Sequence, residues 1–485
     1  MNAFDNQDDD FDLDDMNVED YDNEALGMDA APGVSFADED DAEEPAEPSE
    51  LQRQHILLHD TAHVWHPYTQ HHQAPLPVPI ARAKGSWLYD INGQPLLDAI
   101  SSWWVTTHGH CQPEIVQAIA EQAATLDQVI FAGFTHEPAT ALAAELVGRL
   151  PRGLTRIFYS DDGSTAVEVA IKLSVQSFAN RGQSRRLIAA LDHAYHGDTF
   201  GAMAAGARSV FTNMYEPLLF DVARLPDPSE GDTLAALDAL IAERGNELAA
   251  VIVEPLLLGA GGMRVWDESV LQGIRERTSA AGVHLIADEV LTGFGRTGPM
   301  FACDRADVRP DLLCMSKGLT GGLLPLGATA ATEDIFDAFS STDRRKTFFH
   351  GHSYTANPIA CAAALASLQL FDEECEDERV RIEVAHMRHL AELQGAKGVR
   401  AVRQIGTVAA VELEAGDGYL SDIGRELAAF SLQQGILLRP LGNVAYCLPP
   451  YCTTDREIDA VYTVLKRFLD GERAGPIGTG GPFDD

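Results

Sequence analysis

Lysine is scarce in this sequence, with six residues in 485 against 29 arginines. Positive charge is low altogether, because 74 Asp and Glu outweigh 35 Lys and Arg and leave a formal net charge of −39 at pH 7. Contacts to nucleic-acid phosphates require clustered Lys and Arg, so this balance argues against a nucleic-acid partner. A lysine between apolar residues and glycines, as in "DLLCMSKGLTGG" (311–322), therefore needs a chemical explanation.

Long apolar runs and patterned cysteines are also missing. No run approaches the roughly 18 residues of a membrane-spanning helix, and the acidic start of the chain is unlike a signal or transit peptide. The cysteines are odd in number and show no CxxC spacing; they are Cys111, Cys303, Cys314, Cys361, Cys375, Cys447 and Cys452. These features predict a cytoplasmic protein with free thiols and no membrane anchor, disulfide framework or zinc site.

The first segment, residues 1–50, holds 20 Asp and Glu and no Lys or Arg. Such a segment repels itself and has too little apolar surface to fold, so we predict a disordered acidic tail. A partner-binding role for this tail is the alternative. The ending "GPIGTGGPFDD" predicts a second flexible tail over residues 473–485.

Between the tails the pattern is globular. Continuous apolar runs of strand length recur at 156–160, 186–191, 249–256, 283–290 and 311–316, and stretches compatible with helices separate them. Buried strands that alternate with helices predict an α/β fold with a mainly parallel sheet. "WLYDINGQPLLD" predicts a hairpin with a type I′ turn at Asn92-Gly93. After about residue 372, "TVAAVELE" and "GILLRPL" predict a smaller α+β unit that a helix at 455–470 closes.

Polar residues follow three of the predicted strands, where ligands gather in a parallel sheet. After the strand at 156–160, the amides of Gly163, Ser164 and Thr165 would face an anion at a helix N-terminus. An ordinary N-cap made by Ser or Thr is the simpler interpretation. Asp288 ends another strand, and a helix cap or an ion pair with Arg296 is its alternative role. Lys317 follows the next strand and could instead be a surface lysine.

Together these three features match pyridoxal 5′-phosphate. Its phosphate needs amides, its ring nitrogen needs an anion, and its aldehyde needs an amine. Arginine cannot supply that amine because its guanidinium keeps its proton, whereas a desolvated lysine can lose one.

"LIADEVLTGFGRTGPMFAC" and "PDLLCMSKGLTGGLLPLGAT" closely resemble the class III pyridoxal-phosphate aminotransferases. The resemblance runs from about residue 51 to 470. It implies fold type I, a homodimer with shared active sites, and a large cofactor domain (111–371). A smaller α+β domain would come from both chain ends (51–110 and 372–472).

The resemblance also implies residue roles. Lys317 would bond the cofactor and then move a proton, and Asp288 would pair with its ring nitrogen. Tyr195 would lie against the ring, supported by Asp198.

Cofactor binding would involve two further segments. Gly163 and Ser164 would hold the phosphate, while Gly351, His352 and Ser353 would reach the phosphate and substrate of the neighbouring subunit. The best-known members of the branch described next have Pro-Thr in place of His352-Ser353.

"VWHPYTQ", "LLDAISSWWVTTHGH" and "LRPLGNVAYCLPPY" resemble one branch of the family, which in biotin synthesis transfers the amino group of S-adenosyl-L-methionine to 8-amino-7-oxononanoate. Its substrate pocket would include Tyr68, Trp103, Arg439 and Tyr446, besides Tyr195, Lys317 and Gly351. Aromatic walls suit an aliphatic chain, and a guanidinium suits its carboxylate. Considered without the resemblance, Arg439 could equally form an ion pair at the edge of the core, and Trp103 could belong to the core.

Several alternatives remain open at this point. Lysine could replace S-adenosyl-L-methionine as amino donor. The chain could be another class III ω-aminotransferase, acting on a diamine, β-amino acid or 4-aminobutyrate-like donor. Leu291, where many 4-aminobutyrate and ornithine enzymes carry Gln, favours the biotin branch mildly. A catalytically silent cofactor-binding or interaction protein is the third possibility. His108, His110 and His196 lack the ligands that would complete a metal site.

Overall fold

The computed structural model describes residues 50–416 and 418–474. The predicted acidic tail (1–50) and C-terminal tail (473–485) therefore lie almost wholly outside the described residues. Among the helices of the described part, none is long and apolar enough to cross a membrane.

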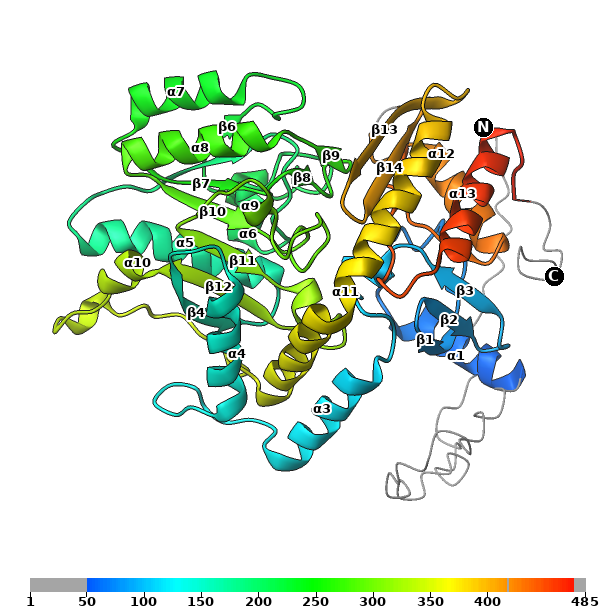
Figure 1. Cartoon of the computed structure of the whole chain (residues 1–485), viewed down its shortest axis with the longest axis horizontal. Coiled ribbons are helices and arrows are strands. Elements are labelled where there is room, and N and C mark those ends of the chain that lie inside the picture. Colours follow the sequence, from blue (N-terminus) through cyan, green and yellow to red (C-terminus); the bar gives the residue numbers. More distant parts are fainter. Residues whose placement is uncertain (1–49, 417, 475–485) are drawn as a thin grey trace, which may run out of the picture. The chain divides into compact units, whose positions relative to one another are not determined.

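A seven-stranded sheet forms the largest layer, in the order β4-β12-β11-β10-β7-β5-β6 (Figure 1). The strands are β4 (Leu154–Ser160), β5 (Leu187–Leu191), β6 (Val222–Leu225), β7 (Leu248–Val253), β10 (His284–Asp288), β11 (Leu312–Met315) and β12 (Gly327–Thr332). Only β12 runs against the others. The predicted α/β fold with a mainly parallel sheet is confirmed, and all five predicted apolar runs contain a strand of this sheet.

Helices cover both faces of the sheet, because alternate side chains of a strand point to opposite sides. On β7, Val251 and Val253 join the core beneath α7 (Thr233–Arg244) and α8 (Glu268–Ala281). Ala250 and Ile252 join the core beneath α5 (Gly163–Asn180) on the other face. A strand buried on both faces has no polar face, which explains the continuous apolar runs in the sequence.

Three smaller sheets are also present in the described chain, and one of them combines segments from both of its ends. In one, β15 (Ile436–Leu437) pairs in parallel with β3 (Pro95–Asp98), which continues into β2 (Trp87–Asp90) and β1 (Ile80–Lys84). Another is antiparallel and contains β13 (Val399–Ile405), β14 (Val408–Leu413) and β16 (Val444–Cys447). The short strands β8 (Leu257–Leu258) and β9 (Arg264–Val265) form a two-stranded sheet.

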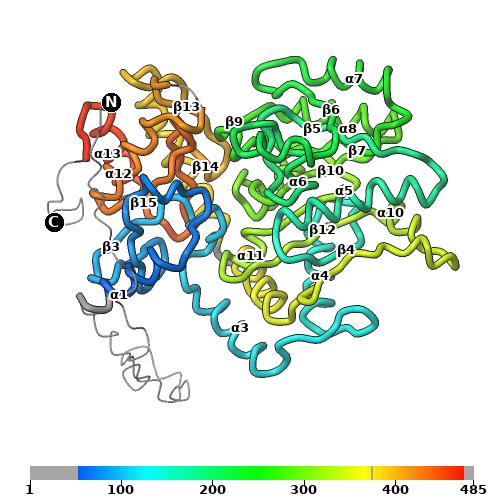
Figure 2. Tube along the Cα trace, turned by 180° about the vertical axis from the view of Figure 1, so that it is seen from behind, coloured from blue at the N-terminus to red at the C-terminus, as the bar shows by residue number. Residues whose placement is uncertain are grey.

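The longest helix, α11 (Pro358–Leu393), runs between the seven-stranded sheet and the smaller sheets (Figures 1 and 2). The expected domain boundary at 371/372 therefore falls inside a continuous helix, and the domain limits stay a prediction. The other α-helices are α1 (Glu50–His63), α2 (Ser101–Trp104), α3 (Pro113–Thr125), α4 (Glu137–Arg149), α5 (Gly163–Asn180), α6 (Phe200–Ala205), α7 (Thr233–Arg244), α8 (Glu268–Ala281), α9 (Ala302–Arg305), α10 (Glu333–Asp337), α12 (Asp422–Gln433) and α13 (Asp455–Leu469). The 3-10 turns are η4 (Glu216–Leu218), η5 (Lys317–Thr320) and η6 (Arg344–Lys346).

The predicted hairpin joins β2 and β3, but the predicted type I′ turn is wrong. A type I′ turn needs positive φ at both central residues, and here only Gly93 has it (φ 77°). The Asp90 carboxylate instead accepts the backbone N–H groups of Asn92 and Gln94, each at 2.8 Å. This local side-chain bonding gives the loop another shape.

Candidate functional site

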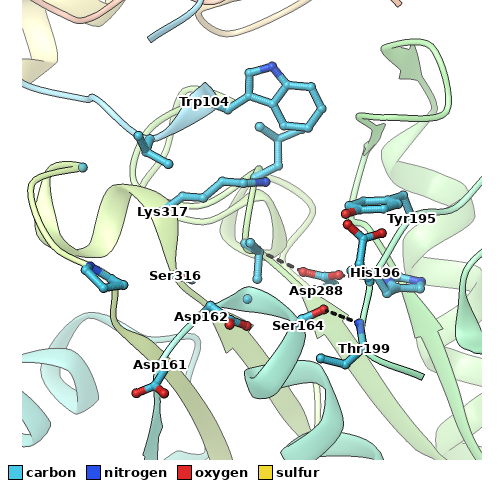
Figure 3. Close-up of a pocket in the computed structure, with 18 of the residues that line it drawn as sticks. Trp104, Asp161, Asp162, Ser164, Tyr195, His196, Thr199, Asp288, Ser316 and Lys317 are labelled. Atoms are coloured by element: carbon cyan, nitrogen blue, oxygen red, sulfur yellow. Dashed lines mark hydrogen bonds and ion pairs between the residues drawn. The ribbon is translucent and has the colours of Figure 1, made fainter. Parts of the chain in front are cut away.

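A cavity of about 690 Å³ opens at the carboxyl ends of the central strands (Figure 3). Of the predicted site residues, Gly163, Ser164, Tyr195, Asp288 and Lys317 line it. They come from four segments that are distant in sequence, each just after a strand of the seven-stranded sheet. The parallel arrangement brings these strand ends to one edge, as the sequence predicted.

Lys317 begins η5 directly after β11, and its side chain extends into the cavity near the Trp104 ring (Figure 3). The ring centroid is 4.8 Å from Nζ. Burial lowers the pKa of the Lys317 amine to about 8, although the charges of Asp288 and Glu254 act in the opposite direction. The residue has φ 47°, a left-handed conformation that a lysine rarely adopts outside functional sites. It is therefore not a surface lysine with a fully solvated ammonium.

Asp288 ends β10 and is only 4% exposed. Its Oδ2 lies 2.7 Å from Nδ1 of His196, and its Oδ1 accepts the backbone N–H of Val290 at 3.1 Å. The alternative pairing with Arg296 is wrong, since that guanidinium donates to the carbonyls of Thr106 and Pro449. These two contacts fix the orientation of the buried carboxylate.

Glu254 follows β7 as Asp288 follows β10, and it also lines the cavity. Its oxygens accept the backbone N–H groups of Tyr195 at 2.8 Å and Gly259 at 3.0 Å. Burial raises the pKa of the Glu254 carboxyl to about 7. This side chain fixes the segment that carries Tyr195 against the end of β7.

The N-terminus of α5 faces the cavity from below in Figure 3. The N-cap of the helix is Asp162 and not the expected Ser or Thr, since its side chain accepts the Thr165 N–H at 2.8 Å. The Thr165 amide is therefore not free to face an anion as predicted. In the described part of the chain, the amides of Gly163 and Ser164 donate to no protein acceptor. They stay available for an anion, and the helix dipole favours one there.

Glycine is required at two positions beside this helix start. A Cβ on Gly163 would lie 2.5 Å from Cγ1 of Val290, and a Cβ on Gly197 would lie 1.8 Å from Oγ of Ser164. Gly197 also has φ 121°, which side chains disfavour. The backbone at 163 and 197 can therefore come close to the cavity only without a side chain.

Tyr195 borders the cavity beside Asp288 (Figure 3). Its hydroxyl is 3.5 Å from that of Tyr68, which donates to Asp198. Burial, followed by the Tyr68 hydroxyl and the Asp198 charge, raises the pKa of Tyr195 well above its usual range. Both phenols therefore stay neutral.

Tyr68, Trp103 and Arg439 form one cluster beside the cavity. The rings of Tyr68 and Trp103 meet edge to face at 5.5 Å, and the Arg439 guanidinium lies 4.5 Å from the Trp103 ring centroid. Among the described residues no carboxylate pairs with Arg439, so the alternative of an ion pair at the core edge is not supported. Asp198 borders both this cluster and the main cavity.

Of the paired tryptophans, Trp104 contacts Lys317 while Trp103 lies further out. Trp104 is 5% exposed and donates from Nε1 to the Tyr446 hydroxyl at 3.0 Å. Tyr446 is buried behind that ring. It reaches the site only through Trp104 and does not line the main cavity.

The predicted segment 351–353 does not line the cavity of its own chain. Gly351 and Ser353 are exposed, and the Ser353 carbonyl accepts from Gln128 at 2.8 Å. His352 is partly exposed and lies 3.2 Å from Asp161, a cavity residue.

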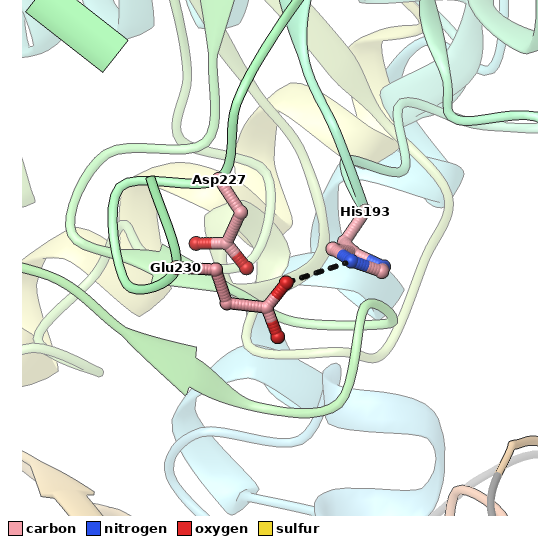
Figure 4. A group of neighbouring side chains, drawn as sticks. All are labelled: His193, Asp227 and Glu230. Atoms are coloured by element: carbon pink, nitrogen blue, oxygen red, sulfur yellow. Dashed lines mark ion pairs between the residues drawn. The ribbon is translucent and has the colours of Figure 1, made fainter. Parts of the chain in front are cut away.

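A second cluster of polar side chains, His193, Asp227 and Glu230, lies close to the Tyr195 segment (Figure 4). Their possible ligand atoms lie within 4.8 Å of one another, which would suit a metal ion. However, Arg264 donates to both carboxylates, at 3.2 Å to Asp227. Because the guanidinium already supplies the positive charge, we interpret the cluster as an ion-pair network.

Among the cavity residues that the sequence patterns did not assign to the site are Trp104, His196 and Glu254. The rule that identified Asp288, a carboxylate at the end of a buried strand, would also have identified Glu254. No sequence signal distinguishes Trp104 from Trp103, or marks His196 as the partner of Asp288.

The lining suits pyridoxal 5′-phosphate. The unpaired amides of Gly163 and Ser164 suit its phosphate, Asp288 suits its ring nitrogen, and the low-pKa amine of Lys317 suits its aldehyde. Nε2 of His196 is buried without a protein partner, which also indicates a polar neighbour in the cavity.

Comparison with known proteins supports this interpretation of the cavity. Residues 68–469 match the family Aminotransferase class-III. The adenosylmethionine-8-amino-7-oxononanoate aminotransferase of Synechococcus elongatus is 50% identical over 421 residues, covering 84% of this chain and 98% of that protein. The protein of that name from Nitratidesulfovibrio vulgaris is 42% identical over 433 residues, covering 84% and 80%.

Solved structures of transaminases support the same interpretation. The crystal structure of the Methanocaldococcus jannaschii enzyme of the same name has a TM-score of 0.82 and 36% identity, covering 86% of this chain and 99% of that one. A PLP-bound amine transaminase from an uncultivated Pseudomonas species has a TM-score of 0.79 and 30% identity, covering 85% and 98%. The expected fold type I is confirmed. The chain belongs to the class III aminotransferases and is a pyridoxal 5′-phosphate enzyme.

Proposed function

We propose that this enzyme transfers the amino group of S-adenosyl-L-methionine to 8-amino-7-oxononanoate and forms 7,8-diaminononanoate for biotin synthesis. The observation that carries the proposal is the 50% identity to a relative of that name over 84% of the chain. The cluster of Tyr68, Trp103 and Arg439 beside the cavity supports it, since it offers aromatic walls and one cation.

Pyridoxal phosphate supplies an aldehyde that takes the amino group and a ring that withdraws electrons from the substrate's Cα–H bond. Lys317 provides the amine that bonds this aldehyde at rest. A pKa of about 8 leaves about a tenth of that amine neutral at pH 7, more than about a hundredfold above the fraction expected at the ordinary pKa of 10.5. With the cofactor bound, the Lys317 Nζ would be the group placed to accept and return a proton at the substrate carbon.

Asp288 and the α5 N-terminus hold the cofactor at its two ends. The Asp288 carboxylate would keep the ring nitrogen protonated, and His196 at 2.7 Å holds that carboxylate in place. The amides of Gly163 and Ser164 bind the phosphate. Tyr195 borders the ring, and Glu254 positions Tyr195 through its backbone N–H.

Arg439 binds the carboxylate of 8-amino-7-oxononanoate, and the rings of Tyr68 and Trp103 contact its aliphatic chain. Arg439 is available for this role because its guanidinium lies over the Trp103 ring and pairs with no carboxylate among the described residues. Tyr446 supports the pocket through Trp104.

A spectrophotometric half-reaction tests the donor, and product analysis tests the acceptor. Adding S-adenosyl-L-methionine alone should shift the absorbance of the bound cofactor, and adding 8-amino-7-oxononanoate should restore it with formation of 7,8-diaminononanoate. A shift with lysine only would reassign the donor. Amination of pyruvate by diamines or β-amino acids, without activity on 8-amino-7-oxononanoate, would establish the ω-aminotransferase alternative. A colourless protein that binds no cofactor would refute an aminotransferase.

We also propose a homodimer in which Gly351, His352 and Ser353 complete the partner's site, and a cytoplasmic location. The exposure of this segment outside its own cavity supports the dimer. The cysteine pattern supports the location. Sedimentation equilibrium tests the homodimer, and cell fractionation tests the cytoplasmic location. Active mixed dimers from inactive Lys317→Ala and Ser353 variants would establish shared sites.

A further inference from the structure

Helix α1 carries histidines at regular four-residue spacing, His55, His59 and His63. Six of the chain's 16 histidines fall within residues 55–72. The proposed aminotransferase function uses none of these six. Tracts rich in histidine are a common feature of metal-binding segments.

The pair His55 and His59 is already arranged as two converging ligands. Residues four apart lie on one face of a helix, and here the two Nε2 atoms are 2.6 Å apart. The ring centroids are 4.3 Å apart and the rings meet edge to face. Both side chains are exposed, so a hydrated ion can reach them from solvent. His63 is a weaker alternative partner, with its ring 5.8 Å from that of His59.

Two imidazoles that face each other share one proton between their nitrogens, and a metal ion can replace that proton. Zinc, nickel and copper bind imidazole nitrogen at about 2.0–2.1 Å, which sets two ligands on one ion about 3 Å apart. The rings of His55 and His59 need to separate by only about half an ångström, which exposed side chains do freely.

Within residues 50–416 and 418–474, no ion pair joins His55 or His59 to a carboxylate. The nearest acidic residue of the helix, Asp60, accepts from His66 at 3.0 Å and not from the pair. The cluster of His193, Asp227 and Glu230 differs, because Arg264 already binds its carboxylates.

We propose that His55 and His59 form a surface site for one divalent transition-metal ion of the zinc, nickel and copper group. Water fills the remaining positions of the ion. A bound ion bridges one helical turn and so stabilises α1. Histidine must be neutral to ligate, so affinity falls as the pH drops to 5. This site is independent of the proposed substrates.

The test is calorimetric titration of the tag-free holoenzyme with Zn²⁺ at pH 7.5. We expect one saturable site that His59→Ala weakens at least tenfold, because both possible pairs include His59. His55→Ala should weaken it by a smaller factor, since His59 and His63 remain. With Cu²⁺ as the probe, EPR should show coupling to two imidazole nitrogens. Unchanged cofactor absorbance in each variant shows that the fold is intact.

Two control variants make the assignment specific. His72→Ala removes an exposed histidine of the same tract, and His193→Ala removes the histidine of the other candidate cluster. Both should leave Zn²⁺ affinity unchanged. The proposal is overturned if the wild type shows no saturable binding, if His59→Ala binds as the wild type does, or if His193→Ala abolishes binding.

Discussion

Gly163 tests whether the start of α5 holds the cofactor. The change Gly163→Ala adds one methyl group 2.5 Å from Cγ1 and 3.0 Å from Cγ2 of Val290. Valine is branched at Cβ and cannot move one methyl group away without moving the other. Overpacking of this kind costs about 1–3 kcal/mol.

The cost should appear mainly as lost cofactor affinity. Val290 donates its N–H to Asp288 at 3.1 Å, and Gly163 offers its own N–H to the phosphate. One methyl group therefore disturbs both ends of the cofactor. If 1–3 kcal/mol falls on binding, affinity drops by about 5- to 150-fold. Titration of the cofactor-free enzyme with pyridoxal phosphate, followed by absorbance, measures the change.

Gly148→Ala is the matched control. Gly148 lies in α4, and a Cβ there would meet nothing within 4 Å. A helical Gly→Ala change in open space stabilises by about 0.5–1 kcal/mol, so this variant should bind the cofactor as the wild type does. If Gly163→Ala also shows wild-type affinity, then either Val290 yields without cost or the phosphate binds elsewhere, and the reasoning fails.

Three further changes test individual side chains. Lys317→Arg should fold but show no single-turnover reaction with any donor. A guanidinium keeps its proton, whereas the lysine amine, with its pKa of about 8, can lose one. Turnover near the wild-type rate would contradict the role of Lys317. Burial raises the pKa of Glu254 from 4.5 to about 7, so its contribution to stability is present at pH 4.5 and is lost as the pH rises through 7. The difference in unfolding free energy between Glu254→Gln and the wild type should accordingly vary between pH 5 and pH 8, and a constant difference would argue against a buried protonated acid. Arg439→Met should raise KM for 8-amino-7-oxononanoate by at least tenfold, the effect of losing a charged hydrogen bond, but should leave KM unchanged for an analogue without the carboxylate. Equal effects on both compounds would indicate a packing role instead.

The sequence alone determined that five buried strands form the sheet and which chemical groups stand at their ends. Continuous apolar runs predicted a buried parallel sheet, and in such a sheet Ser164, Asp288 and Lys317 must meet at one edge. This inference needs only local pattern and the geometry of parallel strands. It therefore required no knowledge of side-chain packing.

Only the tertiary structure decided which neighbours act on these groups. Trp103 and Trp104 are adjacent and chemically identical in sequence, yet only Trp104 contacts Lys317. His196 pairs with Asp288 across 92 positions of the chain. The physical reason is that burial and charge act through space: the pKa of Lys317 depends on desolvation and on carboxylates from other strands, and no local pattern records either of these.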